Sequence, residues 1–217
     1  GVLFHGLYLG GVFYSVSIGI PTGIAALIVT LQPILTNALA GKFLGEEVSF
    51  KQWIGVVLGF FGAALVLGFD IGASLPVIGV IASFIALLAI TTSTLWQKKI
   101  SNNLPLSVSN MYQAIGGCLF HIIIIIIFTD PYINFTTTFL VAMSHQIFLV
   151  SFGAFTILMF LIKNNSASKT VSIFFLIPPT TAVMAWLFLN EVLTNLDLIG
   201  FVVATLGVYI ATRKNKV

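Results

Sequence analysis

The sequence predicts an all-α fold, a polytopic bundle of transmembrane helices built from two inverted-topology repeats of five helices. Three observations predict it: apolar runs of membrane-spanning length, basic residues gathered at one end of those runs, and a match between two parts of the chain at a fixed offset. We expect eight of the ten helices to be present in this chain and the first two to be missing.

Composition excludes an ordinary soluble domain. Of the 217 residues, 59% are apolar and 7% are charged, and the mean hydropathy is +1.13. A soluble domain usually carries about 25% charged residues, because its surface faces water. Lipid allows only helices and closed barrels to span it. The apolar runs extend for about twenty residues, which is the length of a spanning helix and twice that of a barrel strand.

Eight apolar runs are separated by segments rich in turn-forming or charged residues, such as IGIPTG and KKISNNLPLS. The expected spans are residues 1–19, 23–44, 52–69, 76–97, 108–128, 139–162, 168–189 and 196–212. The chain begins with Gly1 inside an apolar run and shows no signal-peptide pattern, so we expect it to be a fragment.

All basic residues lie at one side of the predicted bundle. Asp70, Asp130, Glu191 and Asp197 lie at the ends opposite to every basic residue. Basic residues near span ends favour the cytoplasmic side, so we expect a multi-pass protein with a cytoplasmic C-terminus. The basic residues are Lys42, Lys51, Lys98, Lys99, Lys163, Lys169, Arg213, Lys214 and Lys216.

An internal repeat appears at an offset of 145 residues, where residues 33–62 match residues 178–207 without a gap. The paired loops fall on opposite sides of the predicted membrane, so we expect the two halves to be inverted. Residues 1–70 then hold the last three helices of the first repeat, and residues 76–213 hold all five of the second. The identical pairs are Pro33/Pro178, Thr36/Thr181, Ala40/Ala185, Phe43/Phe188, Leu44/Leu189, Glu46/Glu191, Ile54/Ile199, Gly55/Gly200, Val57/Val202 and Gly62/Gly207.

The block FLGEEVSFKQWIGVVLGFFGAALVL and its repeat FLNEVLTNLDLIGFVVATLGVYI resemble the EamA-type family of ten-helix permeases in the drug/metabolite transporter superfamily. The resemblance covers the whole chain and departs from the repeat pattern at Asn190, which stands where the first half has Gly45. It implies a carrier of the bacterial inner membrane, often an exporter of amino acids or related metabolites.

Polar residues inside the expected spans are candidates for a substrate cavity. Gln32, Thr36 and Asn37 surround Pro33, and Gln32 and Thr36 share one helix face. Amides at this depth need partners, either on a neighbouring helix or in a cavity, and Gln97 is among the further polar residues of the spans. The cavity candidates are Tyr8, Tyr14, Gln32, Thr36, Asn37, Trp96, Tyr112, Gln113, Thr180, Thr181 and Trp186.

Prolines inside two spans are candidate hinges, since proline bends a helix. They are Pro33, Pro178 and Pro179, and a static packing kink is the alternative. Six further residues mark the repeat. We expect Glu46 and Glu191 to cap backbone N–H groups beside the next helix, and the glycines to allow close helix contact. The four glycines are Gly55, Gly62, Gly200 and Gly207.

These observations favour a secondary transporter that moves, in the direction of export, small amino-acid-like or neutral metabolites by alternating access. The middle of each span lacks charged residues, which suits neutral or zwitterionic cargo. The expected partners are the lipid bilayer and a small-molecule substrate, with protons as a candidate coupling ion. We expect no enzyme activity, cofactor, metal or nucleic-acid partner. The alternatives are an intramembrane enzyme and a structural or receptor-like membrane protein.

Overall fold

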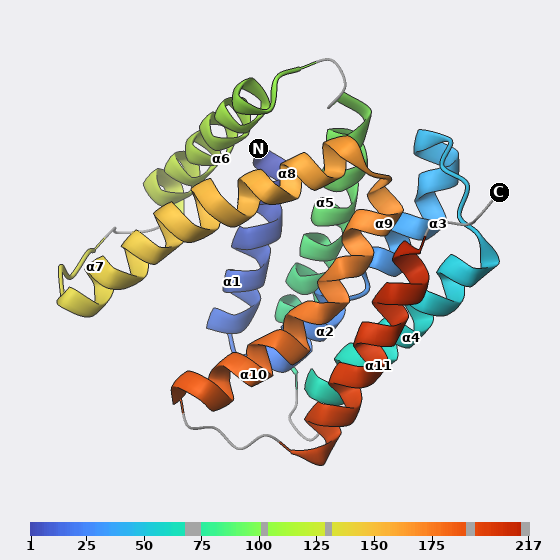
Figure 1. Ribbon diagram of the computed structural model, residues 1–217. Coiled ribbons are helices and arrows are strands. Elements are labelled where there is room, and N and C mark those ends of the chain that lie inside the picture. The colour runs from blue at the N-terminus through green and yellow to red at the C-terminus, as the bar shows by residue number, and fades with distance from the viewer. Residues whose placement is uncertain (68–74, 101–103, 129–131, 190–193, 214–217) are drawn as a thin grey trace.

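The computed structural model describes residues 1–67, 75–100, 104–128, 132–189 and 194–213. These residues form helices and connections, and no strand occurs among them (Figure 1). The elements in chain order are η1 (Val2–Leu9), α1 (Gly10–Ser17), α2 (Thr22–Val29), α3 (Gln32–Leu44), α4 (Phe50–Leu67), α5 (Val77–Ile100), α6 (Leu106–Phe128), α7 (Thr137–Ser144), η2 (His145–Ala154), α8 (Phe155–Asn164), α9 (Ala167–Ser172), η3 (Ile173–Leu176), α10 (Ile177–Leu189) and α11 (Asn195–Thr212).

The predicted polytopic, all-α fold is confirmed. Among the described residues, six helices are long and apolar enough to cross a membrane, and a shorter apolar helix, Val2–Ser17, covers the first expected span. The expected span at 168–189 corresponds to α9, η3 and α10, which follow one another without a break. The six long helices are Thr22–Leu44, Phe50–Leu67, Val77–Ile100, Leu106–Phe128, Thr137–Asn164 and Asn195–Thr212.

The helix boundaries repeat along the chain at the offset found in the sequence. Adding 145 to the bounds of α3 gives those of α10, and adding 145 to the bounds of α4 gives those of α11. The π-helices η1 and η2 end at Leu9 and Ala154, which are again 145 residues apart. Because π-helices are rare, their recurrence at this place is strong evidence that the two parts of the chain fold alike.

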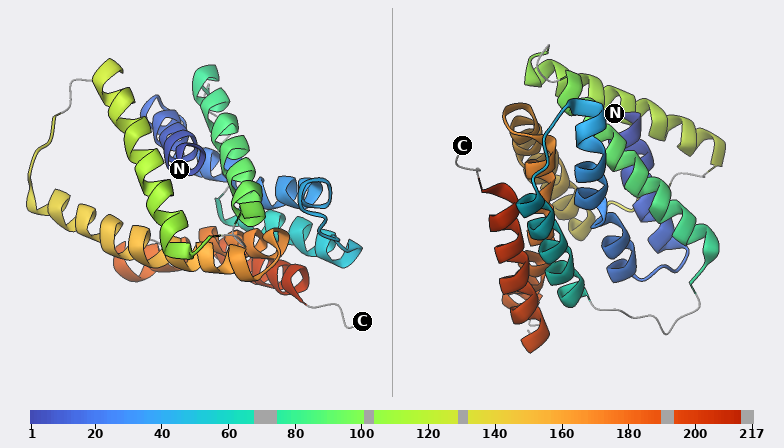
Figure 2. Two further views of the ribbon diagram at one scale, coloured as in Figure 1. Left: turned by 90° about the horizontal axis from the view of Figure 1, so that it is seen from above. Right: turned by 90° about the vertical axis from the view of Figure 1, so that its right-hand side faces the viewer.

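Helices α4 and α11 lie side by side and run antiparallel (Figures 1 and 2). A Cβ atom at Gly55 would lie 2.6 Å from the carbonyl oxygen of Gly207, and one at Gly62 would lie 2.7 Å from that of Gly200. A Cβ atom at Gly200 would lie 2.7 Å from the carbonyl oxygen of Gly62, which is the counterpart of the Gly55 contact at the offset of 145. These four glycines therefore permit close backbone approach of α4 and α11.

Both proline-containing spans leave the α-helical conformation at equivalent positions, just before the proline. Pro33 is the second residue of α3, which follows a turn after α2. Pro178 is the second residue of α10, which follows the 3₁₀ segment η3. Proline suits the first turn of a helix, where its missing N–H has no intrahelical partner. The α-helical conformation is thus interrupted before each proline, whereas bending and hinge action there stay predictions.

Helix α5 lies between the elements of the first half and the later helices. It contacts η1, α1, α2 and α3 on one side and α8 and α9 on the other. Its buried surface mixes small apolar residues with Ser83, Thr91, Thr94 and Gln97. The hydroxyls of Ser83 and Thr91 bond to carbonyls of their own helix. The polar side chains near the C-terminal end of α5 instead bond to other helices, and they position the site described next.

Candidate functional site

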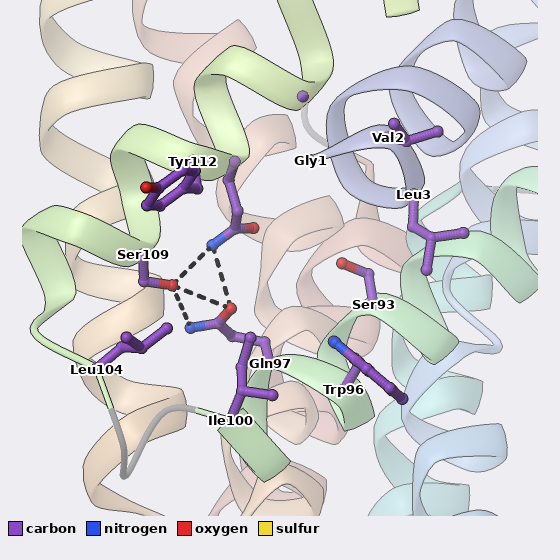
Figure 3. Close-up of a pocket in the computed structure, with 12 residues that line it drawn as sticks. Gly1, Val2, Leu3, Ser93, Trp96, Gln97, Ile100, Leu104, Ser109 and Tyr112 are labelled. Carbon is purple, nitrogen blue, oxygen red and sulfur yellow. Dashed lines mark hydrogen bonds between the residues drawn. The ribbon is translucent and has the colours of Figure 1, made fainter.

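A cavity of about 430 Å³ opens between the start of η1, the last turns of α5 and the first turns of α6 (Figure 3). It lies at the end of the bundle where Lys98 and Lys99 follow Gln97. The lining residues are Gly1, Val2, Leu3, Ser93, Trp96, Gln97, Ile100, Leu104, Ser109, Tyr112, Gln113 and Gly116.

A hydrogen-bond network of three uncharged side chains forms one wall of this cavity. Gln97 Nε2 donates to Ser109 Oγ at 3.1 Å, and Gln113 Nε2 donates to Gln97 Oε1 at 3.2 Å. Ser109 Oγ also lies 3.4 Å from Gln97 Oε1 and 3.5 Å from Gln113 Nε2. All three side chains are buried. The network fixes both amides in position, since each bond restricts the rotamers of two residues.

Two aromatic side chains complete the cavity wall. Trp96 and Tyr112 line it with 61% and 64% of their surfaces exposed, and none of the twelve lining side chains carries a charge. The amide oxygen of Gln113 takes part in none of the network's bonds. Amides both donate and accept hydrogen bonds, whereas an indole and a phenol offer apolar faces with one polar tip. The site thus suits an uncharged or zwitterionic molecule with an apolar part.

A second polar cluster is buried between α3, α4 and α5. Gln32 Nε2 donates to Thr94 Oγ1 at 3.0 Å, and Gln52 Nε2 donates to Asn37 Oδ1 at 3.4 Å. Within the described part of the chain, Asn37 Nδ2 and Thr36 Oγ1 are buried and find no partner. Burying a polar group without a hydrogen-bond partner costs free energy. The cluster carries this cost at two atoms, Thr36 Oγ1 and Asn37 Nδ2.

The remaining sequence candidates are dispersed. Tyr8 is partly buried in η1, where its ring lies 5.4 Å from that of Phe4. Tyr14, Thr180 and Trp186 are exposed on α1 and α10. The side chain of Thr181 and the whole of Glu191 lie outside the described residues. The structure therefore places Trp96, Tyr112 and Gln113 together at the cavity and Gln32, Thr36 and Asn37 in the buried cluster.

Four polar residues of these two sites were not singled out from the sequence. They are Ser93 and Ser109 at the cavity and Gln52 and Thr94 in the buried cluster. Ser109 could have been found, because it precedes Gln113 by one helical turn and so shares its face. Gln52 could not, because its partner Asn37 is on another helix and only the packing of α3 against α4 joins them.

The carboxylate of Glu46 caps a helix, but not the one that follows it. It accepts hydrogen bonds from the backbone N–H groups of Ala167 and Ser168 at 2.7 and 3.2 Å. These residues begin α9, which lies more than a hundred residues further along the chain. The sequence led us to expect capping beside the next helix. Packing of α3 against α9 explains the difference, since it brings the α9 N-terminus to the end of α3.

Comparisons with known proteins agree with this architecture. The sequence profile of the EamA-like transporter family matches residues 2–68 and 77–213. The uncharacterized transporter YvbV of Bacillus subtilis is 28% identical over 225 residues, which cover 99% of this chain and 69% of that protein. A probable amino-acid metabolite efflux pump of Escherichia coli is 21% identical, covering 91% of this chain and 70% of the pump.

Two further matches extend the range of relatives. A chloroplastic WAT1-related protein of Arabidopsis thaliana is 25% identical over 87% of this chain and 48% of its own length. A solved crystal structure superposes with a TM-score of 0.80 at 18% identity, covering 97% of this chain and 75% of the other. At that identity the superposition shows a shared fold and no more. The names of the matched relatives point to transport rather than to catalysis.

Proposed function

We propose a specific transport function for this chain, which belongs to the EamA-like transporter family. It is a multi-pass membrane transporter of the drug/metabolite type, embedded in a lipid bilayer and acting on small molecules. The proposal concerns its substrate, direction and mechanism: export of small amino-acid-like or neutral metabolites by alternating access. Its location is the bacterial inner membrane, with the C-terminus in the cytoplasm.

Alternating access requires two halves that rock against each other around a site between them. The proposed halves are residues 1–70 and residues 76–213, in inverted orientation. The recurrence of helix bounds at an offset of 145 supports this division. The antiparallel packing of α4 on α11 supports the inversion, because these are equivalent helices of the two halves. The proposed hinges are the turn before Pro33 and the 3₁₀ segment η3 before Pro178.

The cavity beside Gln97 is the observation that carries the substrate assignment. Its polar groups are amides and hydroxyls, and its aromatic walls are Trp96 and Tyr112. An anionic phosphate would find no cationic side chain among the lining residues. An amino-acid-like molecule offers donors and acceptors to Gln97 and Gln113 and an apolar side chain to the rings. The name of the Escherichia coli relative, an amino-acid metabolite efflux pump, supports both this class and the direction of export.

A binding screen followed by a flux assay tests the proposal. Purified intact protein is first screened by thermal shift against amino acids and neutral metabolites. Each stabilising compound is then measured for saturable flux in proteoliposomes, with and without a pH gradient to test proton coupling. Saturable flux of an amino-acid-like compound supports the proposal. Chemical conversion of the compound without flux would instead establish the enzymatic alternative.

A further inference from the structure

The carboxylate of Glu46 links the two proposed halves by hydrogen bonds at one end of the bundle. Glu46 follows α3 in the first half, and its carboxylate contacts the start of α9 in the second half. Its Oε1 accepts from Ala167 N at 2.7 Å. Its Oε2 accepts from Ser168 N at 3.2 Å and from Ser168 Oγ at 2.8 Å. A carboxylate at a helix N-terminus is also favoured by the helix dipole.

These bonds complete the capping of α9. The first N–H groups of any helix have no intrahelical acceptor. Lys169 N and Thr170 N are satisfied within the segment, by Ser166 Oγ at 3.4 Å and Ser166 O at 3.1 Å. The N–H groups of Ala167 and Ser168 both bond to Glu46 instead. The second half therefore depends on a residue of the first half for two of its four terminal donors.

A left-handed turn directs the chain out of α3 just before Glu46. Gly45 ends the helix with φ of 67° and donates its N–H to the carbonyl of Gly41 at 3.1 Å. Glycine adopts this conformation without the steric cost that a Cβ atom imposes. The turn releases Glu46 from the helix axis and lets its side chain reach across to α9.

We propose that Glu46 is a positioning residue of the transport cycle, a latch that holds the ends of α3 and α9 together and releases when that end of the bundle opens. The inference rests on the proposed alternating-access function, in which the two halves separate at one end of the bundle at a time. Glu46 acts here through the halves it joins and lies outside the cavity lining.

The position of the latch makes its release reversible. An N–H group exposed deep in lipid would cost several kcal/mol, because no water is there to replace its partner. Glu46 instead lies in the connection between α3 and α4, beyond the end of a spanning helix. Water can hydrate both the carboxylate and the freed N–H groups at that level. The latch can therefore bias the closed arrangement without making it permanent.

Thiol labelling at two buried positions tests the latch. Ala40 is fully buried near the latched end of α3, and Ala25 is equally buried on the first turn of α2, near the opposite end. Ala40→Cys and Ala25→Cys are made separately in a Cys118→Ser background, because Cys118 is exposed and would react itself. A small maleimide is applied to the intact protein in nanodiscs, where it reaches both ends.

Glu46→Gln is the test variant, and Glu47→Gln is its control. Glu47 is exposed on the same loop and makes no described hydrogen bond, so its variant changes the same charge without touching the latch. We expect Glu46→Gln to raise the labelling rate at position 40 about tenfold, because hydrogen bonds to a charged acceptor contribute that much to an equilibrium constant. The labelling rate at position 25 should change by less than about twofold in the same variant. Ser168→Ala keeps both backbone bonds to Glu46. Its labelling rate at position 40 should lie between the rates of the two Glu variants.

Equal labelling at position 40 in the two Glu variants would overturn the latch. A parallel rise at positions 40 and 25 would also overturn it, since that result indicates general loosening rather than opening at one end. The readout needs no substrate. Failure of the flux assay with a working latch would therefore reject transport alone, and flux with no labelling difference would reject the latch alone.

Discussion

Gly62→Ala should destabilise the bundle by forcing α4 away from α11. The new Cβ atom would lie 2.7 Å from the carbonyl oxygen of Gly200 and 2.7 Å from the Cα atom of Ala204. An ordinary contact of this kind is at least 3.4 Å, so the helices must separate by several tenths of an ångström. Both obstructing atoms are backbone, and no side-chain rotation relieves the overlap. Overpacking of this kind costs about 1–3 kcal/mol.

The matched control is Gly10→Ala. A Cβ atom at Gly10 would meet only the ring of His121, at 3.6 Å, and the residue has ordinary helical φ and ψ. Alanine favours a helix over glycine by about 1 kcal/mol, so this variant should be neutral or slightly stabilising. The assay is thermal unfolding of the purified protein in detergent. We expect Gly62→Ala to lower Tm by roughly 2–12 °C. Equal Tm values for the two variants would refute the close contact of α4 with α11.

The remaining predictions concern the polar residues. Gln97→Leu should raise KM for the transported substrate by about five- to 150-fold, because it removes the acceptor of the 3.2 Å bond from Gln113 Nε2 at a loss of about 1–3 kcal/mol. Gln146→Leu, at an exposed site on η2, is its control and should leave KM unchanged. Asn37→Leu and Gln32→Leu should each weaken substrate binding in a thermal-shift titration while the protein stays folded. Unchanged binding in both would remove the buried cluster from the substrate path.

The fold could be predicted from the sequence because a lipid environment constrains it strongly. A run of twenty apolar residues has few other stable conformations, and the expected spans correspond to helices throughout the described chain. The α-helical conformation is interrupted just before Pro33 and Pro178, the two prolines that the offset of 145 had paired. The π-helices η1 and η2 were not predicted, because a π-helix has no residue pattern that distinguishes it from an α-helix in a short apolar run.

The candidate site could be predicted only in part. The sequence shows that a residue lies within a membrane span, but it does not show which residues surround it. Trp96 and Trp186 were therefore both candidates for the cavity. One lines the cavity and the other is exposed on α10. The partner of Glu46 was equally hidden, since it lies in the other half of the chain and is brought there by packing. A local sequence pattern shows that a polar side chain needs a hydrogen-bond partner. The tertiary packing determines which residue provides that partner.

Substrate counterflow in proteoliposomes tests the central claim of alternating access most directly. Vesicles containing the intact protein are loaded with an unlabelled amino-acid-like compound from the binding screen and diluted into a trace of the same compound carrying a radiolabel. A carrier exchanges internal for external substrate, so the label should accumulate transiently above its external concentration. Label that only equilibrates, with no transient accumulation, would contradict a carrier that alternates between its two sides.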